Sequence, residues 1–308
     1  MTTQDSATLS PAIAPQRGTA SGRGRASGTV LAALGVASFS LSFPATVWSL
    51  EGFGPWSSTG LRGVLAGALA ALYLLASGAT PPKRRHWPAL LMVSGGCVLG
   101  FPLLTTLALR TSSTAHSAVV IGVLPLATAV FAAVRTGRRP SRAFWAAALA
   151  GAAAVLAFTL LQSHGRPSAA DLFLFVGVVV CAAGYAEGGR LSRDLPGAQV
   201  IAWAVVVALP VMLVTAGFGL AAEPVRIGPK ALVGLAYIAG VSQFGGFVLW
   251  YRGMAAIGVP RASQLQLGQP LLTLVWSVLL LGEELPAAAP VTAMVVLVCI
   301  AVTQRART

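Results

Sequence analysis

Ten apolar stretches, each about as long as a membrane-spanning helix, follow one another through this sequence. A spanning helix needs about 20 mostly apolar residues. Stretches of this kind occur at approximately 29–50, 57–79, 88–109, 113–134, 143–162, 171–190, 198–220, 230–251, 259–281 and 286–303. The connections between them are too short for a domain outside the membrane. We therefore predict an all-α integral membrane protein with ten transmembrane helices.

The composition argues against a soluble globule. Hydrophobic residues make up 56% of the 308 residues and charged residues 9%, which leaves too few polar groups to coat a soluble surface. A net charge of +13 is typical of nucleic-acid-binding proteins, but here the basic residues occur in short runs between apolar stretches. We interpret them as loop charges that orient a membrane protein, and we expect no nucleic-acid partner.

The distribution of Lys and Arg predicts the orientation. Residues 1–27 are polar and carry three arginines, and we expect them to form a disordered cytoplasmic tail. With the N-terminus inside, sixteen of the 21 Lys and Arg residues fall on the cytoplasmic side and five on the other. This is the asymmetry of the positive-inside rule. It predicts a multi-pass protein of the cell (inner) membrane with both termini in the cytoplasm.

Residues 261–285 are a faint copy of residues 116–140. Pro270 of the second copy aligns with Pro125 of the first. Each copy ends on a glycine, followed by opposite charges: Gly137-Arg138-Arg139 and Gly282-Glu283-Glu284. Opposite charges are expected if the copies cross the membrane in opposite directions, and five helices per half is an odd number. We therefore predict two inverted five-helix repeats, at 28–162 and 171–303.

Four local patterns mark the ends of predicted helices. They are Pro55 with Arg62 seven residues later, Tyr185-Ala186-Glu187 with Arg190, Trp250-Tyr251-Arg252-Gly253, and Pro270 with Gly282-Glu283. Together they resemble the drug/metabolite transporter (DMT) superfamily, in its EamA branch, over nearly the whole chain after residue 28. The resemblance implies ten helices, a central cavity near the midplane between the halves, alternating access, and often export of small metabolites.

Two positions depart from that family pattern. Gly137 is followed by Arg138 where many members have Gly-Glu, and Tyr185 stands where a tryptophan is common. Both departures leave the subfamily and the substrate open.

In the ninth predicted span, polar residues share one face just before Pro270. Ser263, Gln266 and Gln269 recur every third residue, with Gln264 to one side, whereas the matching positions of the fourth span are the apolar Ala118, Ile121 and Leu124. Polar residues at membrane depth are tolerated where they line a cavity. We expect a substrate cavity with one polar and one apolar wall, which suits an amphipathic or zwitterionic solute. The alternative is that the glutamines join helices by hydrogen bonds.

Gln243, Trp250 and Tyr251 are further candidates for the substrate cavity. Gln243 lies mid-span beside Gly245-Gly246, and these glycines permit an unwound segment, although tight helix packing is their commoner use. The two aromatic residues lie near a helix end, where such residues more often form the interfacial belt.

Arg62, Arg252, Pro125 and Pro270 are candidates for structural or gating roles. Arg62 stands five residues into its span, and we expect it to snorkel to the surface. The family resemblance implies that it anchors the outer mouth. We expect His116, near the outer end of the fourth span, to be a hydrated histidine.

Glu187 is an acidic residue well within an apolar span, near its predicted cytoplasmic end. One interpretation is an ion pair with Arg190 or with an arginine of another helix such as Arg252. The other is that burial disfavours the charged form, so that Glu187 carries a proton or holds the amine of a solute.

A membrane enzyme or flippase acting on lipids, a channel-like facilitator and a structural subunit are the alternatives to a transporter. The sequence shows no nucleophile with a base, no metal-ligand spacing, no paired acids at working distance and no P-loop. We therefore predict a non-enzymatic secondary transporter without metal or cofactor, an exporter of small metabolites, amino-acid-like solutes or drugs. Its partners would be a small-molecule solute and the lipid bilayer. Protons are a candidate coupling ion, and the protein would act as a monomer or homodimer.

Overall fold

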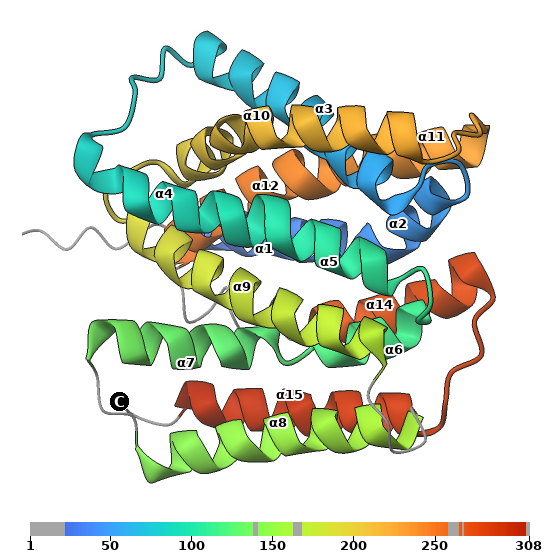
Figure 1. The fold of residues 1–308 in the computed structure, drawn as a ribbon. Coiled ribbons are helices and arrows are strands. Elements are labelled where there is room, and N and C mark those ends of the chain that lie inside the picture. Colours follow the sequence, from blue (N-terminus) through green and yellow to red (C-terminus); the bar gives the residue numbers. More distant parts are fainter. Residues whose placement is uncertain (1–21, 138–140, 163–167, 258–264, 267, 306–308) are drawn as a thin grey trace, which may run out of the picture.

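The structure, a computed structural model, describes residues 22–137, 141–162, 168–257, 265–266 and 268–305. These residues form a bundle of helices with loops at two opposite ends, and no strand occurs among them (Figure 1). In chain order the elements are α1 (Gly22–Ser40), α2 (Ser42–Leu50), α3 (Pro55–Ala76), η1 (Arg84–His86), α4 (Trp87–Val93), η2 (Ser94–Gly100), α5 (Phe101–Ala108), α6 (Thr114–Ile121), α7 (Leu124–Thr136), α8 (Arg142–Gln162), α9 (Ala169–Leu191), α10 (Gly197–Ala222), α11 (Pro229–Ala236), η3 (Tyr237–Gly245), α12 (Gly246–Ile257), α14 (Gly268–Leu281) and α15 (Ala288–Arg305).

Eight helices, some made of consecutive elements, are long and apolar enough to cross a membrane. Two shorter apolar helices follow, Gly268–Leu281 and Ala288–Val302. The predicted all-helical membrane class is confirmed, while eight of the ten predicted spans reach spanning length among the described residues. The ninth predicted span runs from 259 to 281. Its residues 259–264 and 267 lie outside the described part of the chain. Helix α1 begins at Gly22, within the segment predicted as the tail (1–27).

Three of the predicted spans are interrupted part-way along their length. The third contains the π-helical segment η2 and the eighth the π-helical segment η3, and such segments are frequent at functional sites. The fourth breaks between α6 and α7, just before Pro125, which cannot donate a backbone hydrogen bond. The unwound segment considered for Gly245-Gly246 is therefore a π-helix that ends there.

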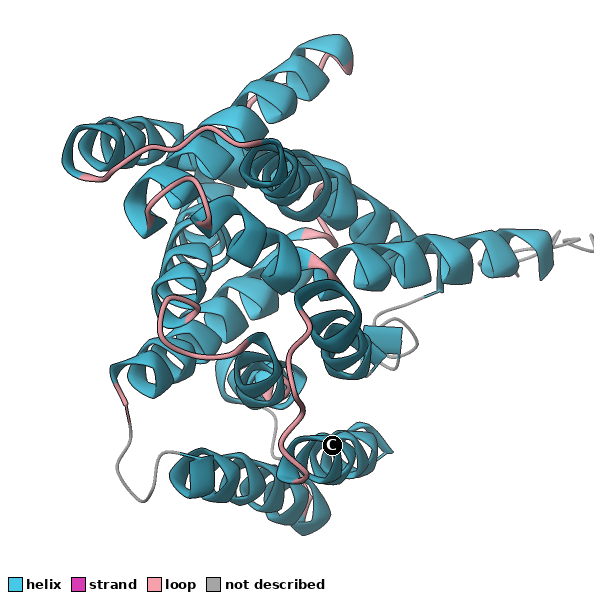
Figure 2. Ribbon diagram, turned by 90° about the vertical axis from the view of Figure 1, so that its right-hand side faces the viewer, coloured by secondary structure: helices cyan, strands magenta, loops and turns pink. Residues whose placement is uncertain are grey.

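Helices from the two halves of the sequence pack against each other in pairs. Helix α3 lies against α10, α1 against α12, α6 against α14, and α8 against α15, while α9 contacts α5 and α7. Figures 1 and 2 show α8 and α15 as a pair at one side of the bundle. Glycines permit the closest pairing. A Cβ on Gly219 of α10 would lie 2.2 Å from the backbone nitrogen of Ser57, and one on Gly60 would lie 2.3 Å from that of Ala216.

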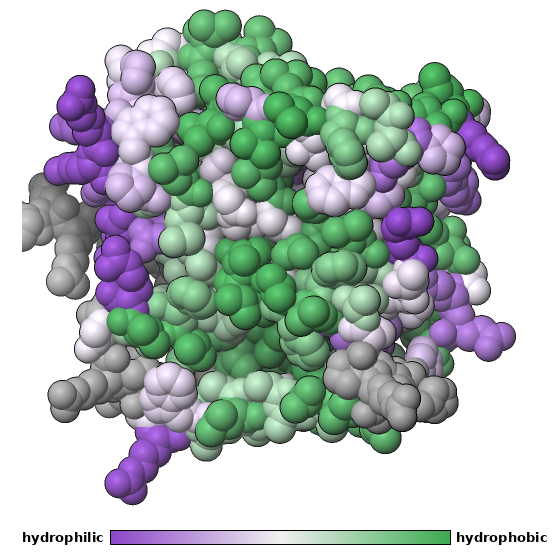
Figure 3. Space-filling view, viewed as in Figure 1, coloured by the Kyte–Doolittle hydropathy of each residue, from purple (hydrophilic) through white to green (hydrophobic). Residues whose placement is uncertain are grey.

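Charged side chains gather at the two ends of the bundle, and apolar side chains cover the surface between them (Figure 3). We call one end the acidic end, because it holds Glu51, Glu223, Glu283 and Glu284. The opposite, basic end holds Lys83, Arg84, Arg85, Arg190 and Arg193. Large apolar side chains such as Leu75 and Val214 are exposed on the surface between the ends. Exposure on this scale is unfavourable in water and favourable in a bilayer.

Candidate functional site

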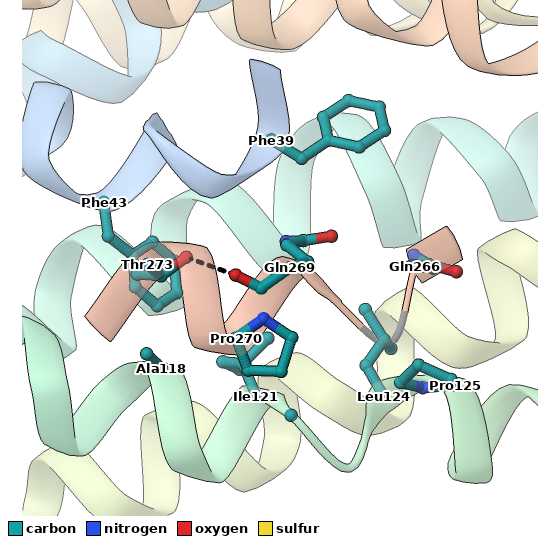
Figure 4. A pocket seen from close by; sticks show the side chains of 11 residues that line it. Phe39, Phe43, Ala118, Ile121, Leu124, Pro125, Gln266, Gln269, Pro270 and Thr273 are labelled. Atoms are coloured by element: carbon teal, nitrogen blue, oxygen red, sulfur yellow. Dashed lines mark hydrogen bonds between the residues drawn. The ribbon is translucent and has the colours of Figure 1, made fainter. Parts of the chain in front are cut away.

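A cavity lies where the break between α6 and α7 faces the start of α14. It has a volume of about 30 Å³ and is lined by Phe39, Phe43, Ala118, Ile121, Gly122, Leu124, Pro125, Gln266, Gln269, Pro270 and Thr273 (Figure 4). We call it the proline cavity, because Pro125 and Pro270 both line it. Helices of the first half supply its apolar side, and residues 266–273 supply the amides of Gln266 and Gln269.

The structure thus brings the described parts of the two predicted walls together. Ala118, Ile121 and Leu124 line the same cavity as Gln266 and Gln269. Neither glutamine side chain makes a hydrogen bond to another described residue, so neither joins helices within the described part of the chain. The hydroxyl of Thr273 ties α14 to α1 by donating to the carbonyl of Ser40 at 2.9 Å. Ser263 and Gln264 lie outside the described residues.

A second cavity, of about 40 Å³, adjoins the first and shares Phe39, Phe43, Leu124 and Gln269 with it. We call it the arginine cavity. Arg62 lines it, is 8% exposed, and donates from Nε to Oε1 of Gln243 at 2.9 Å and from Nη2 to Oγ of Ser242 at 3.3 Å. Oγ of Ser242 lies 2.6 Å from Oγ of Ser42. Three helices therefore meet around the guanidinium.

The inward position of Arg62 differs from the expected snorkelling to the surface. Helix α3 packs between α10 and η3, so its third turn, where Arg62 lies, faces the interior rather than the lipid. Gln243, expected in the substrate cavity, lies beside Arg62, is 1% exposed, and leaves its Nε2 without a hydrogen-bond partner in the described part of the chain.

Five aromatic rings form part of the lining of the arginine cavity. They belong to Phe39, Phe43, Phe101, Tyr185 and Phe247. The rings of Phe39 and Phe247 lie 4.8 Å apart, and those of Tyr185 and Phe247 lie 6.1 Å apart. The sequence did not single out the phenylalanines, because an isolated Phe in an apolar span has the same pattern whether it lines a cavity or packs in a core.

Trp250 and Tyr251 take neither of their expected positions. Both are buried in the core, and neither lines the proline cavity or the arginine cavity. A Cβ on Gly35 would lie 3.0 Å from Trp250, and one on Gly188 would lie 2.6 Å from the Tyr251 hydroxyl. Gly35 therefore lets the backbone of α12 approach α1 closely at Trp250, and Gly188 leaves room on α9 for the Tyr251 hydroxyl.

Glu187 forms two ion pairs near the basic end. Its Oε1 accepts from Nε of Arg135 at 2.9 Å, and its Oε2 accepts from Nε of Arg190 at 2.8 Å. The partner from another helix is thus Arg135 of α7, while Arg252 is exposed on α12. The ion pair with Arg135 joins α7 to α9 near the basic end.

Two carboxylates cap helices at the acidic end. Glu223, which follows α10, accepts from the backbone amides of Trp56 at 3.2 Å and Ser57 at 2.8 Å. Glu283, which follows α14, accepts from the backbone amides of Thr114 at 2.7 Å and Ala115 at 2.9 Å. Carboxylates at helix N-termini satisfy unpaired N–H groups and interact favourably with the helix dipole. Each cap joins the end of a second-half helix to the start of its first-half partner.

His116 is not the hydrated histidine that the sequence suggested. It is buried, its Nε2 lies 2.7 Å from Oδ1 of Asp171, and its ring stacks on Phe158 at 5.3 Å. Asp171 lies in the first turn of α9, where it also completes a capping box with Ser168. The contact between α6 and α9 buries the pair.

Comparisons with known proteins agree with this architecture. The family model described as the EamA-like transporter family matches twice, at residues 26–160 and 168–304. A Bacillus subtilis (strain 168) protein named Uncharacterized transporter YdeK is 42% identical over 272 residues, covering 88% of this chain and 95% of that protein. A crystal structure described only as that of a protein has the same fold, with a TM-score of 0.63 at 21% identity, covering 91% of this chain and 98% of the other.

Proposed function

Because the chain belongs to the EamA-like transporter family, a branch of the drug/metabolite transporter superfamily, we propose that it is a secondary transporter that moves a small solute through the two central cavities. It is a multi-pass membrane protein and a transporter rather than an enzyme. The solutes we propose are small metabolites, amino-acid-like molecules or drugs, and the proposed direction is export. The observation that carries this proposal is the proline cavity, in which the break between α6 and α7 of the first half faces the start of α14 of the second half.

The proposal includes two inverted five-helix halves, with the two short helices α14 and α15 completing a set of ten. The double match to the family model supports two halves. So do the π-helical segments, each in the third helix of its half. The helix pairing supports it as well. Three of the contacting pairs, α3 with α10, α6 with α14 and α8 with α15, each join a helix of the first half to the helix at the same position of the second half.

Alternating access would require the two ends of the bundle to open in turn. The caps of Glu223 and Glu283 hold the acidic end together, and the ion pairs of Glu187 hold helices together near the basic end. We propose that these contacts break and re-form as access changes. Cavities of 30–40 Å³ hold about a water molecule each, so a solute would enter only after the halves move apart.

The proposed orientation places the basic end in the cytoplasm and the acidic end outside, in the cell inner membrane. The exposed charges support it, because Lys83, Arg84, Arg85, Arg190 and Arg193 share the basic end. On this orientation, export would begin with entry of the solute between the basic ends of the helices.

A flux measurement in reconstituted vesicles tests the proposal. Substrate candidates would come from a comparative uptake and resistance screen of cells with and without the gene. Gln266→Leu should slow flux at least about tenfold while the protein stays inserted and folded, because it removes a polar group from the cavity. Leu279→Gln, a polarity change of similar size on the exposed far side of α14, is the matched control. Unchanged flux in Gln266→Leu would contradict a transport route through the proline cavity.

A further inference from the structure

Arg62 is a buried cation without a carboxylate partner among the described residues. Its hydrogen bonds to described residues go to neutral groups, the amide oxygen of Gln243 and the hydroxyl of Ser242. The remaining nitrogen, Nη1, makes no hydrogen bond to a described residue. Arg62 therefore keeps both its charge and donor capacity at the wall of a cavity.

The described acidic residues are engaged or located elsewhere. Glu51 bonds Lys230, Asp171 bonds His116, Glu187 bonds Arg135 and Arg190, Asp194 lies near Arg85 and His86, Glu223 and Glu283 cap helices, and Glu284 is exposed at the acidic end. None of them contacts Arg62. The counter-charge for this guanidinium is thus not supplied by the described part of the chain.

An unpaired charge in a membrane interior is costly, and such charges are found where they face a cavity or a ligand. A guanidinium is suited to a carboxylate, because its planar donors match the two carboxylate oxygens. Ser242 and Ser42 lie beside Arg62 in the same cavity. One hydroxyl proton lies between them, so the pair offers one hydroxyl donor to a bound oxyanion.

The other residues that line the arginine cavity favour an organic anion over an inorganic one. Five aromatic rings and the side chains of Leu124, Cys97 and Cys181 surround the space next to the guanidinium, together with Thr46 and Thr105, whose hydroxyls donate to backbone carbonyls of their own helices. These groups favour an apolar body and offer a hydrated inorganic anion few polar contacts. Gln269, shared by the two cavities, lies on the side toward the proline cavity.

We propose that Arg62 binds the carboxylate of the transported solute, and that the solute is a small organic acid or zwitterion with an apolar body. Ser242 and Ser42 assist at the carboxylate, and the aromatic rings contact the apolar part. This inference rests on the proposed transport function and specifies its substrate class.

The test compares each acid with its carboxamide, which has nearly the same shape without the negative charge. The full chain, purified in detergent, is melted with hexanoate or hexanamide, with leucine or leucinamide, and with inorganic phosphate or chloride alone. A ligand that binds the folded state raises the melting temperature. At least one of the two carboxylates should stabilise the wild type, and its amide should bind at least about tenfold more weakly.

Two variants remove the site in different ways. Arg62→Gln removes the charge, and Gln243→Glu places a carboxylate of nearly unchanged shape against Arg62. Both should abolish stabilisation by the carboxylates. Gln243→Glu supplies the missing counter-charge, so it remains informative if Arg62→Gln fails to fold. Arg84→Gln, at an exposed arginine, should bind as the wild type does.

Several results would overturn the proposal. They are stabilisation by neither carboxylate, equal stabilisation by acid and amide, retained carboxylate binding in Gln243→Glu, or stabilisation by phosphate or chloride alone. Flux of the same labelled compounds into vesicles separates this inference from the transport function. Flux of hexanamide as fast as hexanoate would leave transport intact and contradict the role of Arg62, whereas Arg62-dependent binding without flux of any bound compound would contradict transport.

Discussion

Oε1 of Glu283 accepts a 2.7 Å hydrogen bond from the backbone amide of Thr114, across 169 positions of sequence. Glu223 makes the equivalent contact with Ser57 at 2.8 Å, across 166 positions. In each case a carboxylate that follows a second-half helix caps the first turn of its first-half partner. At the acidic end of the bundle, two contacts of the same kind therefore join helices of the two halves.

Glu283→Gln should loosen the acidic end. The amide keeps one acceptor oxygen and loses the charge. We expect this to lower the free energy that favours the capped over the open acidic end by about 1 kcal/mol, which raises the open population roughly fivefold. A Thr46→Cys reporter in the arginine cavity, in a chain whose three native cysteines are replaced by alanine, should react with a maleimide correspondingly faster.

The matched control is Glu284→Gln, one residue further along the chain. Glu284 is exposed, so its substitution should leave the labelling rate unchanged. Equal rates in the two variants would mean that the carboxylate of Glu283 contributes nothing to closure.

Gly219→Ala should destabilise the pairing of α3 with α10. The added Cβ would lie 2.2 Å from the backbone nitrogen of Ser57, so the helices must separate, at a cost of about 1–3 kcal/mol. On the same helix, a Cβ on Gly217 meets nothing within 4 Å, and Gly217→Ala should be neutral or slightly stabilising. Melting temperatures in detergent compare the two, and a lower value for Gly217→Ala than for Gly219→Ala would contradict the packing.

Glu187→Gln distinguishes an ion pair from a proton carrier. Since Glu187 is held by Arg135 and Arg190, we expect a loss of stability of about 1 kcal/mol, with accumulation driven by a pH gradient retained in vesicles. Glu51→Gln, which breaks an exposed ion pair with Lys230 at the other end, is the control for a generic loss of charge. Proton coupling would instead be assigned to Glu187 if Glu187→Gln lost gradient-driven accumulation but kept solute exchange, while Glu51→Gln kept both.

Reporter fusions test the proposed orientation. A reporter after Arg193 follows α9 at the basic end, and one after Pro224 follows α10 at the acidic end. The first should report the cytoplasm and the second the opposite side of the membrane, because the basic end carries the arginines. The reverse pattern would contradict both the orientation and the proposed direction of export.

The spans could be predicted from the sequence because each is a local property of about 20 consecutive residues. The sequence partly predicted that the two cavity walls face each other, because Pro125 and Pro270 occupy matching positions in the related segments 116–140 and 261–285. The depth of Arg62 could not, because its distance from the helix start is compatible with either lipid or interior. That choice depends on α10 and η3, which are distant in the chain.

The caps and the aromatic lining were missed for a similar reason. Glu223 is an isolated acid in a loop, which is usually solvated, and its role appears only when the start of α3 lies beside it. Trp250 and Tyr251 lie near a helix end, as interfacial residues do, but both are buried in the core, where Gly35 permits close approach of α1 to the backbone of Trp250 and Gly188 leaves room for the Tyr251 hydroxyl. Pairing between distant helices decides each of these positions.

Bridging the acidic end during transport tests the central claim, that solute passes between halves that open in turn. Ser57→Cys and Glu223→Cys replace side chains whose oxygens lie 2.8 Å apart. A short bis-methanethiosulfonate should join the two thiols in a chain lacking native cysteines. We predict that vesicle flux of the identified substrate falls to background when the bridge forms, and returns when dithiothreitol removes it, with each single-cysteine variant unaffected by the reagent. Undiminished flux through fully bridged protein would contradict alternating access through the acidic end.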